Sequence, residues 1–136
     1  MIPITPITRE QARNYSPLTL AFLGDSVYEL LVRHKIALNG SCPVKKLHNR
    51  AVEKVRASYQ AEGVRAVESM LTEEEADFIR RGRNANSTVP KSSSVEDYRL
   101  ATGLETLFGY LYLIGETDRI EQLFEVIYAR ENFAVG

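Results

Sequence analysis

Two carboxylates, Asp25 and Glu105, lie within largely apolar segments of this 136-residue chain, where an unpaired charge is costly. Each is therefore expected to meet a cation, a metal ion or several hydrogen-bond donors. A glycine accompanies each acid: Gly24 precedes Asp25, and Gly109 lies one helical turn after Glu105. A glycine inside a helix costs about 1 kcal/mol relative to alanine, which is understandable where another backbone or a substrate comes close.

Local signals place the first acid on a helix. Ser16 and Pro17 have the chemistry of a helix start and Asn39-Gly40 that of a helix end, which predicts a helix from about Leu18 to Leu38. We expect this helix to be buried. One face of it combines acidic and apolar side chains at helical spacing: Leu18, Ala21, Phe22, Asp25, Tyr28, Glu29 and Val32. Four of its apolar residues, Phe22, Leu23, Leu30 and Leu31, exceed what one face can bury, which is compatible with a helix at a dimer interface.

The second acid lies on another predicted helix, from Ser94 to Ile114, with Ser94 and Asp97 as a capping pair and Gly115 as the stop. One face of it carries Tyr98, Ala101, Glu105, Phe108 and Tyr112. Two such helices could cross closely and hold both acids around one cation, and paired carboxylates suit Mg²⁺, which prefers oxygen ligands. The alternative is that the two acids are separate structural groups, each paired with an arginine or a helix end.

Both acidic segments resemble a known family. Phe22-Leu23-Gly24-Asp25 resembles the Phe-Leu-Gly-Asp core of the ribonuclease III signature, and Leu104-Glu105-Thr106-Leu107-Phe108-Gly109 is similar to the family's second acidic motif. The likeness extends from about Leu18 to Tyr128. It implies an all-α fold, a ribonuclease III endonuclease domain-like helical bundle that works as a two-fold dimer. In that family, both motifs line a Mg²⁺ site that cuts double-stranded RNA.

The chain also departs from the family pattern. Ribonuclease III usually has Glu at the positions of Leu18 and Ala21 and Asp at that of Thr102, so Asp25 and Glu105 are what remains of the usual acids. Fewer direct carboxylates predict weaker metal binding. This reduced set more closely resembles Mini-ribonuclease III, a short bacterial subfamily whose members cut double-stranded RNA and mature large-subunit ribosomal RNA. Further segments fit that subfamily: Arg81-Gly82-Arg83-Asn84-Ala85-Asn86 followed by Pro90-Lys91, Tyr98-Arg99, and Val32-Arg33-His34.

Basic and polar residues in the middle of the chain are candidates for RNA contact. They form a lysine and arginine stripe on a predicted helix that begins at Pro43, and an arginine-rich run that leads into a polar loop. Arginine and lysine meet phosphates, while short polar side chains read the wide minor groove of A-form RNA. The alternatives are a solvated helix face and an ordinary helix C-terminus followed by a loop. The candidate residues are Lys46, Arg50, Arg81, Arg83, Asn84, Asn86 and Lys91.

The rest of the chain also reads as helical, which predicts the all-α class. After an irregular N-terminus, the helix from Pro43 is expected to break near Gly63. Thr72 and Glu75 form a capping box for a helix that runs to about Arg81. A polar loop over residues 82–93 then precedes the helix of the second acid. The last helix is predicted from Thr117 to about Arg130, with an inward face of Ile120, Leu123, Phe124 and Ile127.

Composition limits the function further. The net charge of −1 argues against a generally basic RNA-binding protein, but acidic residues gather near the C-terminus and basic ones in the middle. The lone Cys42 excludes an intramolecular disulfide, and no signal peptide or membrane-length apolar run is visible. We therefore expect a cytoplasmic protein without a membrane partner. Residues 1–136 are expected to form a single ribonuclease III-like catalytic domain with no double-stranded-RNA-binding domain, so RNA binding must come from this domain, dimerisation or a partner.

The predicted function is metal-assisted hydrolysis of double-stranded RNA by a homodimer. Asp25 and Glu105 are the expected catalytic and metal-binding residues, and Mg²⁺ is the expected cofactor. The resemblance implies a ribosomal RNA precursor or a pre-ribosomal particle as the substrate. Two alternatives remain: a catalytically inactive ribonuclease III-like RNA-binding protein, and a helical protein–protein adaptor.

Overall fold

The computed structural model describes residues 5–85, 88–91 and 94–135, and side chains as far as residue 129. All the regular structure in these residues is helical, which confirms the predicted all-α class. In chain order the elements are α1 (Arg9–Arg13), α2 (Pro17–Ala37), α3 (Val44–Val55), α4 (Ala57–Val67), a 3₁₀ turn (Glu68–Met70), α5 (Glu73–Arg83), α6 (Val95–Leu113) and α7 (Thr117–Val135).

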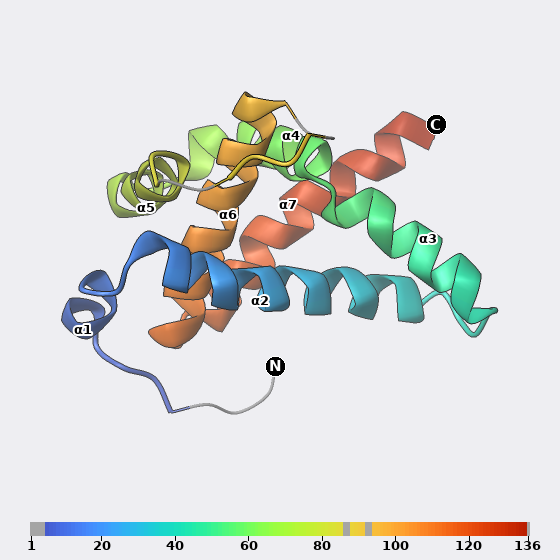
Figure 1. Ribbon diagram of the computed structural model, residues 1–136. Helices are drawn as coiled ribbons and strands as arrows, with labels where there is room; N and C mark the ends of the chain where they lie inside the picture. The colour runs from blue at the N-terminus through green and yellow to red at the C-terminus, as the bar shows by residue number, and fades with distance from the viewer. Residues whose placement is uncertain (1–4, 86–87, 92–93, 136) are drawn as a thin grey trace.

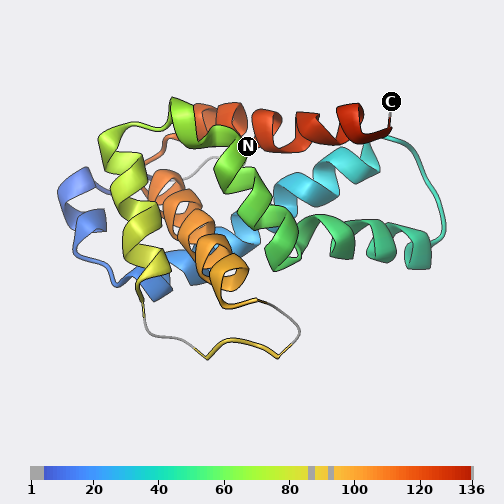
Figure 2. The same cartoon turned by 90° about the horizontal axis from the view of Figure 1, so that it is seen from above.

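The central element is α6, which contacts α1, α2, α4, α5 and α7. Its middle is buried on nearly every side, because apolar residues follow one another there without a polar face. Figure 1 shows α6 running across the direction of α2, and Figure 2 shows α5 beside α6. Where α2, α6 and α7 meet, the ring of Tyr28 lies 6.0 Å from that of Phe108 and 5.8 Å from that of Phe124.

The helices that carry the two acids begin and end where the sequence predicts, to within a residue or so. The hydroxyl of Ser16 accepts a hydrogen bond from the amide of Thr19 at 3.1 Å, and that of Ser94 accepts one from the amide of Asp97 at 3.0 Å. After α6, Gly115 has φ +81°, a backbone conformation that residues other than glycine rarely adopt. These local signals are satisfied within one or two turns, so the sequence alone could reveal them.

Two glycines allow α2 and α6 to touch backbone to backbone. A Cβ atom on Gly24 would overlap the carbonyl oxygen of Glu105 and lie 2.8 Å from the amide nitrogen of Gly109. Reciprocally, a Cβ atom on Gly109 would overlap the carbonyl oxygen of Leu20. The close crossing predicted from the glycine positions is confirmed.

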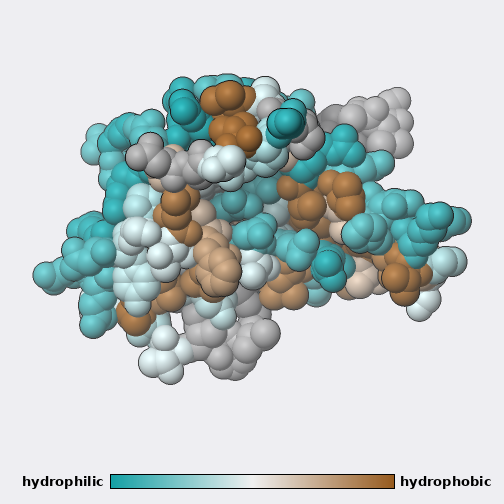
Figure 3. All heavy atoms as spheres, in the orientation of Figure 1, coloured by the Kyte–Doolittle hydropathy of each residue, from teal (hydrophilic) through white to brown (hydrophobic). Residues whose placement is uncertain are grey.

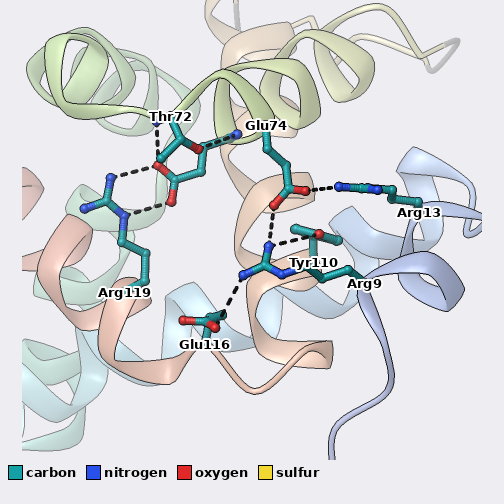
Figure 4. Close-up of polar contacts among 8 residues, drawn as sticks. Arg9, Arg13, Thr72, Glu74, Tyr110, Glu116 and Arg119 are labelled. Atoms are coloured by element: carbon teal, nitrogen blue, oxygen red, sulfur yellow. Dashed lines mark hydrogen bonds and ion pairs between the residues drawn. The ribbon is translucent and has the colours of Figure 1, made fainter.

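A polar network fastens α5 to its neighbours (Figure 4). The guanidinium of Arg119 donates to both carboxylate oxygens of Glu75 at 2.8 Å and to the carbonyl of Met70 at 2.7 Å. Burial acts to raise the pKa of Glu75, but Arg119 and the capping contacts with Thr72 hold it below its ordinary value. On the other side of α5, Glu74 pairs with the arginines at positions 9 and 13. The predicted capping box of Thr72 and Glu75 is confirmed.

Three expectations were wrong in part. The predicted break near Gly63 does not occur: α4 continues through that residue, and the chain instead turns at Arg56, whose ψ is 152°. Gly63 is needed because a side chain of α7, Ile127, packs against it. The short helix α1 lies in the segment expected to be irregular, and its signal was the capping box of Thr8 and Gln11. The last helix continues beyond Arg130 to Val135.

We predict that Gly24→Ala destabilises the protein by about 3 kcal/mol or more, because the new methyl group meets backbone that cannot move without separating α2 from α6. The matched control is Gly63→Ala, whose Cβ would lie 2.9 Å from Cγ2 of Ile127, a side-chain atom. We expect a smaller cost, of about 1–2 kcal/mol, since the buried side chain of Ile127 can shift where backbone cannot and alanine also favours the helix. Urea unfolding of both variants measures the difference, and equal losses would contradict the backbone contact.

Candidate active site

The α2–α6 crossing brings Asp25 and Glu105 together. Glu105 is partly buried, and its pKa is raised to about 8. Burial is the largest cause, followed by the negative charge of Asp25 and direct contact with its carboxyl group, whereas a polar contact with Gln60 acts in the opposite direction. The two acids therefore share one site, as expected, and within the part of the chain that the structure describes neither forms an ion pair with an arginine.

Asp25 itself is exposed, which corrects the expectation that it lies on a buried helix face. The buried face of α2 contains Leu20, Ala21, Gly24, Val27, Tyr28, Val32 and Ile36. Asp25 lies beside this face, and Phe22, one turn earlier, is 83% exposed. Helical spacing alone placed these residues with the core, but none of the described helices covers them. Asp25 is thus accessible to solvent, whereas Glu105 is only partly accessible.

Two of the three positions at which ribonuclease III usually has further acids, Ala21 and Thr102, are buried here. Ala21 is buried, and the buried Thr102 donates its hydroxyl hydrogen bond to the carbonyl of Tyr98 at 3.0 Å. Leu18 is exposed at the start of α2. Among the described residues, no three His, Cys, Asp or Glu side chains lie together as a metal-binding group would. The acids of this site are the predicted pair.

Sequence reasoning missed Gln60, a residue of α4 that contacts Glu105. Its side chain is 2% exposed, and its amide nitrogen donates to the carbonyl of Val55 at 2.8 Å. The amide oxygen accepts no hydrogen bond from the described residues. The available signal was a carboxamide between the buried residues Tyr59 and Ala61, but nothing in the sequence connects that position with the second acidic motif.

The side chains of Asp25 and Glu105 offer carboxylate oxygens, which are the ligands that a hard divalent cation such as Mg²⁺ prefers. Two neighbouring carboxylates repel each other in their charged forms, and a bound cation would relieve that repulsion. The polar contact of Gln60 with Glu105 favours the charged form of that carboxyl group, which is the form that binds a cation.

The candidate RNA-binding residues are dispersed over α3, the end of α5 and the following loop. Lys46 and Arg50 are exposed on α3, Lys91 is exposed in the loop, and Asn84 caps α5. Asn86 lies outside the described residues.

Two of the candidate arginines have structural partners. The guanidinium of Arg81 donates to the carbonyls of Arg13 and Tyr15 at 3.3 and 3.4 Å and lies 5.0 Å from the ring centre of Phe78. Arg83 forms an exposed ion pair with Glu96 at 3.3 Å. These contacts fasten the α1–α2 connection and the start of α6. The remaining basic candidates, Lys46, Arg50 and Lys91, have no such contact with the described residues.

Comparison with known proteins agrees with this geometry. The sequence profile of the Ribonuclease III domain matches residues 18–116, which includes both acids and the whole of their two helices except the first residue of α2. The chain belongs to the ribonuclease III family, and the predicted class, an endoribonuclease, is confirmed.

Relatives within the family match most of this chain. The chain is 48% identical over 121 residues to Mini-ribonuclease 3 of Thermoanaerobacter sp. (strain X514), covering 88% of this chain and 85% of that one. It is 40% identical over 122 residues to Mini-ribonuclease 3 of Clostridium tetani, covering 88% and 81%. The predicted likeness to that subfamily is confirmed.

A solved structure supports the fold. The crystal structure of a Fusobacterium nucleatum protein superimposes with a TM-score of 0.79 at 34% identity, covering 85% of this chain and 94% of that one. Among the described residues, none of the helices has the length and apolar character needed to cross a membrane.

The raised pKa of Glu105 predicts how stability changes with pH in the metal-free protein. The unfolded chain loses this proton near the ordinary pKa of 4.5, but the folded protein keeps it until about pH 8. The folded state therefore binds more protons between these values, and its stability falls as pH rises through the window. At about 1.4 kcal/mol per pKa unit, the loss is on the order of a few kcal/mol. Glu105→Gln should remove it.

Urea unfolding of both proteins in a chelating buffer, at pH values from 5 to 9, is the measurement. We expect the Glu105→Gln variant to become progressively more stable than the parent protein as pH rises. Parallel stability curves for the two proteins would contradict the buried, coupled state of Glu105.

Proposed function

We propose that this protein hydrolyses double-stranded RNA in a Mg²⁺-dependent reaction and acts in the cytoplasm on the precursor of large-subunit ribosomal RNA. The observation that carries the proposal is the pairing of Asp25 with Glu105 at the backbone contact of α2 and α6, in a chain of the ribonuclease III family. The substrate class follows from that family, and the ribosomal precursor from the likeness to Mini-ribonuclease 3.

Each residue of the pair has a distinct part. Asp25 is exposed, so its carboxylate is available to a cation that arrives with the RNA phosphate. Glu105 lies on α6 beside Asp25, and because its pKa is raised its carboxyl group would have to lose a proton to hold a cation tightly. When bound, Mg²⁺ would lower the pKa of the attacking water and stabilise charge on the phosphate and the departing oxygen. The apparent metal affinity should therefore fall below about pH 8.

Duplex RNA would be held by exposed cations on α3 and in the α5–α6 loop. Lys46 and Arg50 share one solvent-facing stripe, and Lys91 is exposed in the loop. Their long side chains suit phosphate contact, which fixes the register of a duplex without reading its sequence. Arg81 and Arg83 already have protein partners, so their contribution to RNA binding is expected to be smaller.

A two-fold dimer would complete the enzyme. The side of α2 that none of the described helices covers presents Phe22, which is 83% exposed, Leu30, 48%, and Leu18, 38%. Figure 3 shows hydrophobic surface in separate patches on the face along which α2 runs. Such exposed apolar residues on one helix are typical of a protein interface. Because Asp25 lies on the same helix, dimerisation would place two acid pairs near one shared surface.

Asp25→Asn tests the proposed chemistry. We expect the variant to cut a long RNA duplex at least about 100-fold more slowly, because the amide keeps the shape but cannot hold a divalent cation as a carboxylate does. Binding of the duplex, measured without metal, should be unchanged. Cleavage at the parental rate would contradict the proposal. Duplex binding without Mg²⁺-dependent cleavage by the parent protein would instead favour the inactive RNA-binding alternative, to which the missing acids at Ala21 and Thr102 point.

Phe22→Ser tests the dimer. We expect the purified variant to sediment as a monomer at concentrations at which the parent protein is a dimer, since an exposed phenylalanine contributes a large apolar area to an interface. The matched control is Val44→Ser on α3, a residue that is 79% exposed but lies on another helix. If both variants remain dimeric in analytical ultracentrifugation, the α2 surface is not the interface.

A further inference from the structure

A buried hydroxyl joins the two helices that carry the acids. Thr106 follows Glu105 directly in α6, and its side chain is fully buried. Its hydroxyl donates to the carbonyl of Thr102 in the same helix at 2.8 Å and to the carbonyl of Pro17, the first residue of α2, at 3.2 Å. A hydroxyl has one hydrogen, so the two carbonyls share it. Thr106 is therefore bonded to its own helix and to α2 at once.

The end of α5 seals this hydroxyl from water. A Cβ atom on Gly82 would overlap Oγ1 of Thr106 and would lie 2.9 Å from Cα of Gly103. The absence of a side chain at Gly82 thus leaves room for the hydroxyl. A hydrogen bond without competing water is stronger than an exposed one. The bond to Thr102 also limits the rotation of the threonine side chain, so that the hydroxyl keeps one direction.

This hydrogen bond supplies a restraint that the glycines of the crossing do not. The contacts at Gly24 and Gly109 set how closely α2 and α6 approach. Such contacts resist closer approach, but they leave the helices free to slide or rotate against each other. A hydrogen bond depends on direction and weakens when its angle changes. The bond between Thr106 and Pro17 therefore favours one register of α6 against α2.

We infer that Thr106 is a positioning residue, whose hydroxyl fixes the register of α6 against α2 and thereby keeps Glu105 in place beside Asp25. The inference rests on the proposed function, in which the two acids hold a cation. Pro17 and Asp25 belong to one continuous helix, so a shift at the first turn of α2 moves the acid with it. Small displacements of catalytic groups have large effects on rate.

Three variants test the role of the hydroxyl. Thr106→Ala and Thr106→Ser both lack the methyl group of threonine, so the comparison between them isolates the oxygen. Thr102→Ala is the matched control, because the buried hydroxyl of Thr102 donates at 3.0 Å to the carbonyl of Tyr98 within α6 itself. It removes a hydrogen bond of the same kind from the same helix, but not the bond to α2.

Two properties are measured in each variant at a temperature well below its melting transition. The first is the kcat and KM for cleavage of a long RNA duplex with Mg²⁺. The second is the dissociation constant of Mn²⁺ without RNA, an ion that accepts the same oxygen ligands as Mg²⁺. Free Mn²⁺ is followed by electron paramagnetic resonance at pH 9, where Glu105, with its pKa of about 8, is mostly charged.

We expect Thr106→Ala to lower kcat about tenfold and to weaken Mn²⁺ binding, because the acids no longer meet in a fixed geometry. KM should change little, since the cations proposed to hold RNA lie on α3 and in the α5–α6 loop. Thr106→Ser should restore most of both losses. Thr102→Ala should keep the parental kcat and Mn²⁺ affinity even if its melting temperature falls.

The inference is overturned by parental kcat and Mn²⁺ affinity in Thr106→Ala, by equal losses in the Ala and Ser variants, or by an equal loss in Thr102→Ala. Asp25→Asn separates these results from failure of the proposed function. Losses in Asp25→Asn with none in Thr106→Ala remove only the role of Thr106. Unchanged cleavage and Mn²⁺ binding in Asp25→Asn remove the cation site and the inference with it. If the parent protein binds Mn²⁺ without cutting RNA, the Mn²⁺ affinities alone decide the inference.

Discussion

Backbone contact between α2 and α6 is the constraint on which the rest of this structure depends. Gly24 and Gly109 each lie against the other helix where any Cβ atom would overlap its carbonyl groups. This contact fixes the separation of the two helices and so the separation of the acids that they carry. Stability and active-site geometry therefore rest on the same few atoms, and a small group added at Gly24 would disturb both.

The crossing also holds the site in an electrostatically unfavourable state. Two carboxyl groups lie together, one of them partly buried, and the metal-free protein accommodates this by keeping a proton on Glu105 to about pH 8. Packing around α6 offsets the cost, because Phe108 and its neighbours are buried there. Ionisable groups held in such an environment are typical of functional sites. A divalent cation that enters beside the exposed Asp25 would replace the proton and remove the repulsion.

Helix α3 connects this site with the surface that we propose for RNA. Its last carbonyls are held by Tyr28 from α2 and Gln60 from α4, so its C-terminal end is fixed to elements that also contact the acids. Lys46 and Arg50 project from the same helix into solvent. A duplex bound by these cations would be positioned relative to Asp25 by rigid helices. Catalytic and binding side chains are held more precisely on helices than on loops.

The sequence by itself determined the all-α class and the bounds of the two acid-bearing helices, because caps, glycines and apolar periodicity are local signals. The pairing of Asp25 with Glu105 was favoured over two separate structural acids only through the resemblance to ribonuclease III. It placed Asp25 on a buried face, since periodicity shows that residues share a side of a helix but not whether another helix covers it. It also predicted a break at Gly63, where tertiary packing on Ile127 explains the glycine instead. Only the tertiary structure brought Gln60 to Glu105, because that contact joins α4 to α6 across 45 positions of sequence (105 − 60). Contacts between distant segments are decided by how whole helices pack, which no local pattern records.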